Sequence, residues 1–232
     1  MEHRKFLTSF DGARIHYDVG RIKGSGLCLV FLHGLTGNLT AWNEERKYFK
    51  NRKVSTLAID LRGHGYSDRS NDKEYYKLGS FAKDVKLVMN NERFSRYVIV
   101  GHCFGGMVAI TLQASEPKLA EGLVLVDTSF KPPQMMEPIR DSVFLRWILG
   151  LMAENIPEIK QRGYVDYDNF VGTTDLDPGR VIRDVLHTSL KSFLLICENL
   201  LNYDAKTLLG RITVPTLVIE GERDTIFPVE VA

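Results

Sequence analysis

The most constraining feature of this 232-residue sequence is a cysteine placed between two glycines, directly after an apolar run. The segment reads Val98-Ile99-Val100-Gly101-His102-Cys103-Phe104-Gly105-Gly106. The apolar run predicts a buried strand, and residues 103–115 predict a helix that ends near Pro117. A sharp turn from strand to helix strains the backbone of its central residue, so the residues two before and two after it must be small. Gly101 and Gly105 meet that requirement, and we predict a tight strand–turn–helix unit centred on Cys103.

This unit would place the Cys103 thiol at the carboxyl edge of a sheet, over the N-terminus of a helix. The backbone amides there favour a negative charge and should increase the fraction of thiolate. A thiolate at such a position is a candidate nucleophile. The alternative is that Cys103 is a small buried apolar residue between unrelated glycines. The five-residue pattern alone leaves both interpretations open.

Strand-like and helix-like segments alternate through the first 130 residues. The segments 6–8 and 13–17 flank the turn-forming pair Asp11-Gly12 and predict a hairpin. Continuous apolar runs, typical of strands buried on both faces of a parallel sheet, occupy 27–32, 54–59, 97–100 and 123–126. Apolar residues at helical spacing follow Leu78, with Ser80 as a candidate helix cap. We expect an α/β fold with a mostly parallel central sheet flanked by helices.

The pattern changes after Asp127. Residues 131–209 contain no convincing strand and several helical patterns, one of which begins at Asp177-Pro178. A strand-like run returns at 216–219. We therefore expect a core made of residues 1–130 and 210–232, and a helical lid made of residues 131–209 inserted between two strands.

Composition and motifs exclude several classes of function. The formal net charge is +1 and no Lys/Arg run is present, so we expect no nucleic-acid partner. Residues 1–5 lack a signal peptide, and the most apolar later stretch, 143–153, is too short to span a membrane. The three cysteines form no disulfide framework, which predicts a reducing, cytoplasmic location. No phosphate-binding glycine motif and no histidine pair with metal-ligand spacing occur, so no cofactor and no metal are expected. The oligomeric state is not predictable.

The chain resembles the α/β-hydrolase superfamily over essentially its whole length, because four motifs occur in the order that the family has them. The first is His33-Gly34-Leu35-Thr36-Gly37-Asn38 after a buried strand, and the second is the glycine-rich turn from Asp60 to Asp68. The elbow around Cys103 is the third. The fourth, from Ile212 to Asp224, is similar to the strand and loop that deliver the acid of the catalytic triad.

This resemblance implies roles for individual residues. Cys103 would be the nucleophile, and the backbone N–H groups of Leu35 and Phe104 would form the oxyanion hole. Asp224 would orient a histidine, with Asp127 as the backup acid; the alternative for Asp224 is a turn or helix-capping aspartate. The side chains and turns that would shape the elbow and the oxyanion loop are His33, Gly34, Gly101, His102 and Gly105. The aromatic residues Trp42, Trp147, Tyr164, Tyr167 and Phe193 are candidates for an acyl pocket or for plain core.

Two features depart from the family pattern. Most relatives have serine at the elbow, whereas cysteine resembles the dienelactone hydrolases; a serine-to-cysteine change that leaves a slow enzyme is the alternative. The family also places a histidine after the acid, and none of the six histidines follows Asp224. We therefore expect a further C-terminal strand and helix, with the general base, to be missing from this sequence. His187, on the predicted lid helix, could in principle reach down as the base, but the interpretation we favour for it is an ordinary surface histidine.

The leading functional hypothesis is a hydrolase that acts on a small carboxylic ester, lactone or thioester through a Cys103 acyl-enzyme. Its partner would be a small ester-like molecule, with no membrane involved. Two alternatives stay open. One is a catalytically impaired or non-catalytic relative that binds a ligand, and the other is a carbon–carbon hydrolase or lyase on the same scaffold.

Overall fold

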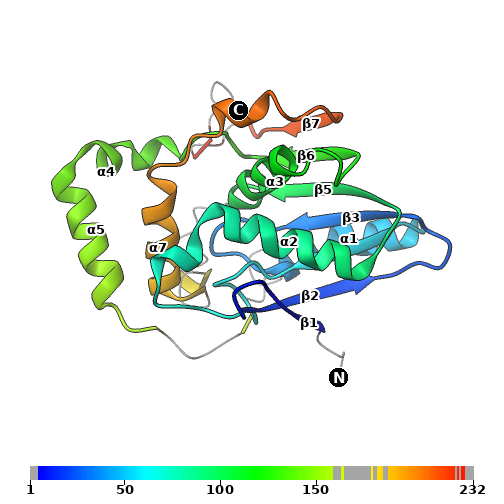
Figure 1. Cartoon of the computed structure of the whole chain (residues 1–232), viewed down its shortest axis with the longest axis horizontal. Helices are drawn as coiled ribbons and strands as arrows, with labels where there is room; N and C mark the ends of the chain where they lie inside the picture. The colour runs from blue at the N-terminus through cyan, green and yellow to red at the C-terminus, as the bar shows by residue number, and fades with distance from the viewer. Residues whose placement is uncertain are drawn as a thin grey trace.

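One sheet organises the molecule. The computed structural model describes residues 5–158, 163–164, 179, 182–184, 188–222, 224 and 226–227. The described strands form a seven-stranded sheet in the order β1-β2-β4-β3-β5-β6-β7 (Figure 1). They are β1 (Lys5–Thr8), β2 (Arg14–Gly20), β3 (Leu27–Leu32), β4 (Ser55–Ile59), β5 (Arg96–His102), β6 (Gly122–Val126) and β7 (Thr216–Ile219).

The register aligns the carboxyl ends of the parallel strands. β1 and β2 form an antiparallel hairpin, and β2 pairs antiparallel with β4. The remaining pairs are parallel, with Leu32 opposite Gly101 and His102 opposite Val126. The residues that follow β3, β5, β6 and β7 therefore meet at one edge of the sheet, where ligands bind in open α/β sheets.

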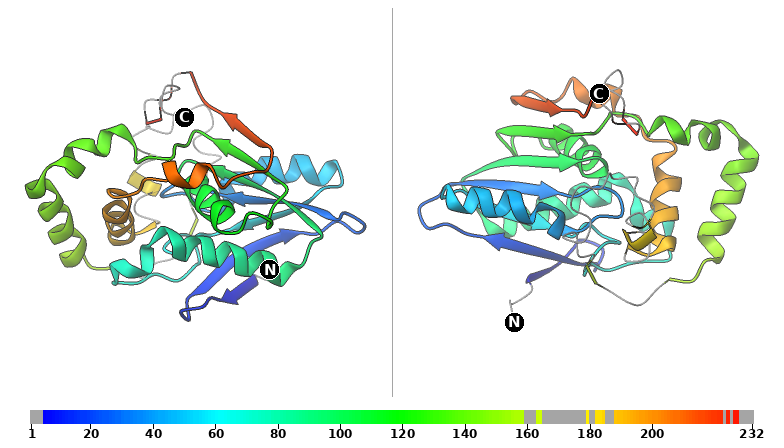
Figure 2. Two further views of the ribbon diagram at one scale, coloured as in Figure 1. Left: turned by 45° about the horizontal axis from the view of Figure 1, so that its top comes forward. Right: turned by 180° about the vertical axis from the view of Figure 1, so that it is seen from behind.

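Helices cover both faces of the sheet, because alternate residues of each buried strand face opposite sides (Figure 2). In β3, Val30 and Leu32 join the core cluster under α2 (Leu78–Glu92) and α3 (Phe104–Ser115), whereas Leu29 and Phe31 join the cluster on the other face. α1 (Asn43–Asn51) lies over that second face. The predicted α/β fold class, with its mostly parallel sheet flanked by helices, is confirmed.

The predicted cap of α2 is wrong. The helix begins at Leu78, its N-cap residue is Lys77, and no side chain caps it. Ser80 is the third helical residue, and its own backbone N–H bonds to the carbonyl of Lys77. A residue this far inside the first turn cannot accept from the helix's free amides as an N-cap does.

The described part of the 131–209 region is helical and contains no strand. α5 (Val143–Asn155) and α7 (Leu190–Leu200) pack against each other beyond the carboxyl edge of the sheet (Figures 1 and 2), whereas α8 (Lys206–Leu209) packs against α3. The start predicted at Asp177-Pro178 lies outside the described residues, as do Tyr167 and His187. The helices with described bounds there are α4 (Glu137–Asp141), α5 (Val143–Asn155), α7 (Leu190–Leu200) and α8 (Lys206–Leu209). The short 3₁₀ turns among the described residues are η1 (Leu39–Trp42), η2 (Lys73–Tyr76) and η3 (Gln134–Met136).

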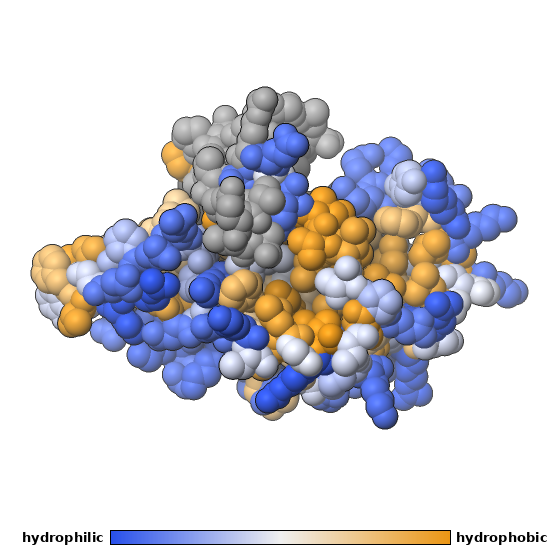
Figure 3. All heavy atoms as spheres, turned by 90° about the horizontal axis from the view of Figure 1, so that it is seen from above, coloured by the Kyte–Doolittle hydropathy of each residue, from blue (hydrophilic) through white to orange (hydrophobic). Residues whose placement is uncertain are grey.

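β7 forms one edge of the sheet, and all four of its residues are exposed. Figure 3 looks down on this side and shows apolar surface there; the large exposed apolar residues of β7 are Leu217, Val218 and Ile219. Across the described residues, no helix has the length and apolar character needed to cross a bilayer.

Candidate active site

Cys103 occupies a strained turn between β5 and α3. Its backbone angles are φ 50° and ψ −116°, a conformation that residues with a side chain rarely adopt. The N–H of Cys103 donates to the carbonyl of Val126 at 2.9 Å, and the residue is half-buried. The neighbouring strand therefore holds the turn in place, with Cys103 at the carboxyl edge of the sheet.

The flanking glycines are required because the backbone passes too close for any side chain. A Cβ on Gly105 would lie 2.3 Å from the carbonyl oxygen of Leu32. A Cβ on Gly101 would lie 2.5 Å from the carbonyl oxygen of Gly105. Such separations are far inside van der Waals contact, so these two glycines allow α3 to start directly against β3 and β5.

Thr128 braces the turn from the end of β6. Its hydroxyl donates to the carbonyl of Cys103 at 2.6 Å, and its backbone N–H donates to Glu220 Oε1 at 3.2 Å. Its side chain also packs against Gly106, where an added Cβ would lie 2.5 Å from Thr128 Cγ2. Thr128 is not among the predicted site residues, because its only signal in the sequence is that it follows a predicted strand at the carboxyl edge.

The loop of residues 33–38, here called the oxyanion loop, follows β3. The N–H of Leu61 donates to His33 Nε2 at 3.0 Å, so Nε2 carries no proton, and Nδ1–H donates to the carbonyl of Gly34 at 2.8 Å. Burial, together with neighbouring His64, lowers the pKa of His33 to about 3. His33 is therefore neutral near pH 7 and serves as a hydrogen-bonding group of the loop.

The oxyanion loop lies directly against the elbow. A Cβ on Gly34 would come within 2.9 Å of His102 Nδ1 and 3.3 Å of Cys103 Cβ, so the loop backbone passes over both residues. Leu35 is partly buried against the main core, and Phe104 is the first residue of α3. The first amides of a helix have no acceptor within the helix. Two features therefore lie beside Cys103: the oxyanion loop, which contains Leu35, and the backbone amide of Phe104.

Both predicted acids lie in one cluster at the ends of β6 and β7. Carboxylate oxygens of Asp127, Glu220 and Asp224 all lie within 4.8 Å of one another. Burial, and then the neighbouring Asp127 and Asp224, raise the pKa of Glu220. The two alternatives from the sequence therefore share one location, and Glu220, which the sequence analysis left without a role, lies between β7 and the elbow brace Thr128.

The acids already accept hydrogen bonds from the local backbone. Asp224 Oδ1 accepts from the N–H groups of Ile226 and Phe227 at 2.6 and 3.0 Å, as a turn aspartate does. Asp127 Oδ1 accepts from the N–H of Gly221 at 2.7 Å. The cluster has the oxygen donors that a cation would need, but these bonds also account for the cluster as loop structure.

Three of the described histidines, His16, His33 and His64, make their hydrogen bonds away from the acids. His33 and His64 are buried and neutral near pH 7, because burial also lowers the pKa of His64, to about 4. His16 Nδ1 lies 2.8 Å from Asp60 Oδ2 inside the molecule. Within the described residues, the hydrogen bonds of Asp127 and Asp224 involve no histidine side chain.

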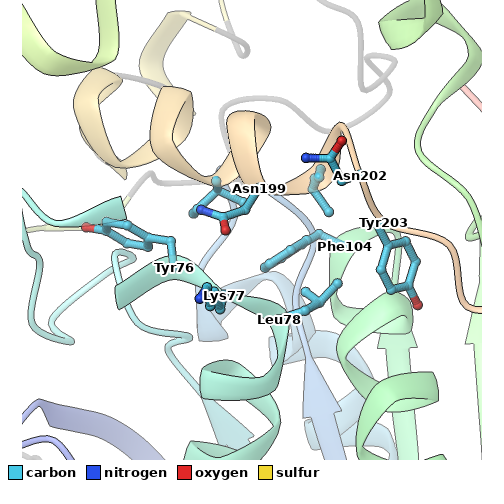
Figure 4. Close-up of a pocket in the computed structure, with 9 residues that line it drawn as sticks. Tyr76, Lys77, Leu78, Phe104, Asn199, Asn202 and Tyr203 are labelled. Carbon is cyan, nitrogen blue, oxygen red and sulfur yellow. The ribbon is translucent and has the colours of Figure 1, made fainter. Parts of the chain in front are cut away.

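A pocket of about 200 Å³ adjoins the elbow. It lies between the start of α2 and the end of α7, with Phe104 in its wall (Figure 4). Cys103 does not line it. Its lining residues are Tyr76, Lys77, Leu78, Phe104, Ile196, Asn199, Leu200, Asn202 and Tyr203.

The described aromatic residues considered for an acyl pocket do not line this one. Trp42 is buried in the core cluster beneath α1, and Phe193 is partly buried against the main core. The Trp147 side chain is 61% exposed, so it is neither core nor pocket wall. Tyr164 has a different set of contacts, described below.

Known proteins resemble this chain. A family model described as alpha/beta hydrolase fold matches residues 28–160. Epoxide hydrolase 4 of Mus musculus is 32% identical over 143 residues, which are 62% of this chain and 36% of that protein. The 3-oxoadipate enol-lactonase 2 of Acinetobacter baylyi is 24% identical over 212 residues, which are 85% of this chain and 72% of that protein. The chain thus matches little more than a third of the length of the first of these relatives.

A solved structure with the same architecture is the enol-lactonase from Burkholderia xenovorans LB400. Its TM-score is 0.72 at 22% identity, with 98% of this chain and 85% of that chain covered. At this level of identity the likeness establishes the arrangement of strands and helices.

Proposed function

Because this chain belongs to the alpha/beta hydrolase fold family, we propose that it hydrolyses small carboxylic esters or lactones through an acyl-enzyme on Cys103. The observation that carries the proposal is the strained backbone of Cys103, with φ 50° and ψ −116°. Strain of this kind persists only where the surroundings impose it, and it clusters at functional sites. Here Gly101, Gly105 and Thr128 impose it. A cysteine with a purely packing role would not need this conformation.

The chemistry begins with attack of the Cys103 thiolate on the carbonyl carbon of the substrate. A carbon–sulfur bond forms, and the carbonyl electrons move to oxygen, which accepts hydrogen bonds from the amides of Leu35 and Phe104. Fixed donors of this type lower the barrier because they need no reorganisation as charge develops. The intermediate then collapses, the bond to the leaving oxygen breaks, and the leaving group takes up a proton as an alcohol.

The second half of the reaction is hydrolysis of the thioester. Water attacks the acyl carbon, the carbon–sulfur bond breaks, and a carboxylic acid and the Cys103 thiol are released. This step is fast only when a base removes a proton from water. Asp127, Glu220 and Asp224 supply a negative environment for an imidazolium, but the described residues provide no histidine bonded to them. From the described residues alone we expect acylation to outpace deacylation.

Small acyl groups are the first to test. The adjoining pocket of about 200 Å³ is smaller than the usual 300–1,000 Å³ of drug-sized ligand sites. Relatives named as enol-lactonases favour lactones as the first substrates to test. The carbon–carbon hydrolase alternative has no observation of its own in its favour.

The proposal is tested by burst kinetics with 4-nitrophenyl acetate. We expect a rapid release of about one nitrophenolate per chain followed by a slower steady rate, and no burst from Cys103→Ala. Cys28 and Cys197 remain in that variant as internal controls for non-specific thiol acylation; burial raises the pKa of each to about 12. An equal burst from Cys103→Ala would contradict the proposal.

A non-catalytic ligand-binding role is the second candidate. It is favoured by the acids, whose oxygens are already engaged by the amides of Gly221, Ile226 and Phe227. This candidate predicts no burst with any activated ester, while lactones still raise the thermal midpoint of the protein. A panel of lactones measured in both assays separates the two functions.

A further inference from the structure

The oxyanion loop contains a residue that strains its backbone. Thr36 has φ 72°, in the left-handed region that β-branched residues rarely occupy. Within the loop, the carbonyl of Gly34 accepts hydrogen bonds from Gly37 N–H and from His33 Nδ1–H. Neither of these bonds involves the carbonyl of Thr36. Strained conformations persist only when neighbouring groups hold them, so the contacts of Thr36 with other parts of the chain matter.

One such contact comes from the 131–209 region. The hydroxyl of Thr188 donates to the carbonyl of Thr36 at 2.8 Å, across 152 positions of sequence. Thr188 is 1% exposed, and the bond to Thr36 is partly buried. Its neighbour Ser189 has φ 85° and caps α7 by accepting from the N–H of Ser192. The backbone that presents Thr188 is therefore tied to the start of a helix.

A second contact reaches Leu39, the residue directly after the loop, through Asp60. Asp60 is fully buried at the end of β4, and its Oδ1 accepts from the N–H of Leu39 at 2.8 Å. Its Oδ2 accepts from the Tyr164 hydroxyl at 3.0 Å and lies 2.8 Å from His16 Nδ1. The Tyr164 ring also packs edge-on against Tyr66, with ring centroids 4.7 Å apart. Tyr164 belongs to the same 131–209 region as Thr188.

We propose that Thr188 and Tyr164 are positioning residues through which the 131–209 region clamps the oxyanion loop, at Thr36 within the loop and at Leu39 directly after it. Thr188 holds the strained Thr36 carbonyl directly. Tyr164 acts through Asp60, because one carboxylate oxygen of Asp60 accepts from Tyr164 and the other from Leu39. The inference rests on the proposed function, since it assigns these residues to the loop that would present the amide of Leu35 to the substrate.

The consequence is that loop geometry depends on the packing of an inserted region. An oxyanion donor is effective only near its ideal position, and a displacement of about 1 Å can reduce a rate by roughly a hundredfold. Without the clamp, the oxyanion loop can relax the Thr36 strain and move its amides. Acyl transfer should then slow, whereas a thiol reaction that develops no oxyanion should continue.

The test compares two reactions of the same thiol in Thr188→Val and Tyr164→Phe. Acylation of Cys103 by 4-nitrophenyl acetate requires the oxyanion hole, and alkylation of Cys103 by iodoacetamide does not. Each variant should lose about tenfold or more in acylation rate with an alkylation rate within about twofold of the unmodified protein. Thr188→Ser retains the hydroxyl and should restore acylation. Tyr97→Phe removes a buried hydroxyl at the opposite end of β5 and should leave both rates unchanged.

Amide exchange provides a readout that does not depend on catalysis. In the unmodified protein the N–H of Leu39 is protected by Asp60, and both variants should raise exchange across residues 34–39 relative to Tyr97→Phe. Unchanged acylation-to-alkylation ratios together with unchanged exchange would overturn the clamp. If the unmodified protein is not acylated at all, the proposed function is wrong. The clamp is then tested by amide exchange across residues 34–39 alone.

Discussion

The hydroxyl of Thr128 donates a 2.6 Å hydrogen bond to the carbonyl oxygen of Cys103. This bond joins the end of β6 to the strained residue between β5 and α3, 25 positions earlier in the chain. The same residue reaches Glu220 through its backbone amide, so one threonine connects the elbow with the acidic cluster. The geometry of Cys103 is thus held by a neighbouring strand end as well as by its own glycines.

Replacing Thr128 by valine should therefore cost stability and reactivity together. Loss of one buried hydrogen bond costs about 1 kcal/mol of unfolding free energy, within the usual range for such bonds. We also expect slower acylation of Cys103, because its carbonyl is less firmly held. Thr128→Ser keeps the hydroxyl and should stay closer to the parent protein in urea unfolding; equal losses for serine and valine would show that the hydroxyl is not the cause.

Gly105→Ala should be much more damaging than its position near a helix start suggests. The new Cβ would lie 2.3 Å from the Leu32 carbonyl, which is backbone and cannot move aside cheaply. Overpacking of this severity costs about 3 kcal/mol or more. Gly79 is a matched control, because it is likewise the second residue of a helix and has open space around it. Gly79→Ala should stabilise α2 by up to about 1 kcal/mol; similar effects at both positions in thermal unfolding would refute the packing argument.

The glycine-rich turn after β4 is held by a buried ion pair. Arg62 and Asp84 are 0% and 1% exposed, and the guanidinium contacts both carboxylate oxygens at 2.7 and 2.8 Å. Asp84→Asn leaves the buried Arg62 with Asp11 as its one charged partner among the described residues and should cost up to about 3 kcal/mol. The exposed pair of Arg96 and Glu121 provides the comparison, since Glu121→Gln should cost less than about 1 kcal/mol. Chemical denaturation of both variants measures the difference.

The free energy of unfolding should fall as the pH is lowered from about 6.5 towards about 4. The pKa of buried His33 is lowered from 6.5 to about 3 and that of His64 to about 4. Below about pH 6.5 the unfolded chain binds protons that the folded chain does not. The free energy of unfolding therefore decreases with falling pH until about pH 3–4. Each histidine contributes at most about 1.4 kcal/mol per pH unit in this window.

The measurement is the urea midpoint between pH 7.5 and pH 4.5 for the parent protein and for His33→Gln. Glutamine can accept from the Leu61 amide without titrating, so this variant should be less stable at pH 7.5 yet lose stability less steeply on acidification. An unchanged slope in His33→Gln would mean that His33 is not the group responsible.

Local patterns in the sequence were sufficient for the sheet and the elbow. The buried run Leu27–Leu32 is a strand with the predicted bounds, and the glycines around Cys103 follow from short-range backbone geometry. The acids were harder to assign, because the order of strands in the sheet is not visible in a linear pattern. Asp127 and Asp224 are far apart in sequence, but β6 and β7 are neighbours, so both carboxylates reach one cluster.

Contacts between distant segments could not be predicted at all. Tyr164 and Asp60 are 104 positions apart, and Thr188 and Thr36 are 152 positions apart. No periodicity or motif relates such pairs, because only the packed fold brings the 131–209 region onto the oxyanion loop. The assignment of Ser80 as a helix cap was wrong for the opposite reason, since several residues near a helix start have capping chemistry and only the backbone shows where the helix begins.

The central claim is that Cys103 is the nucleophile of an acyl-enzyme. Its most direct test is peptide mapping by mass spectrometry after brief exposure of the native protein to 4-nitrophenyl acetate. The account predicts a single acetyl group on the peptide that contains Cys103, with Cys28 and Cys197 unmodified and no adduct in Cys103→Ala. An acetyl group distributed over several nucleophiles, or its persistence in Cys103→Ala, would contradict it.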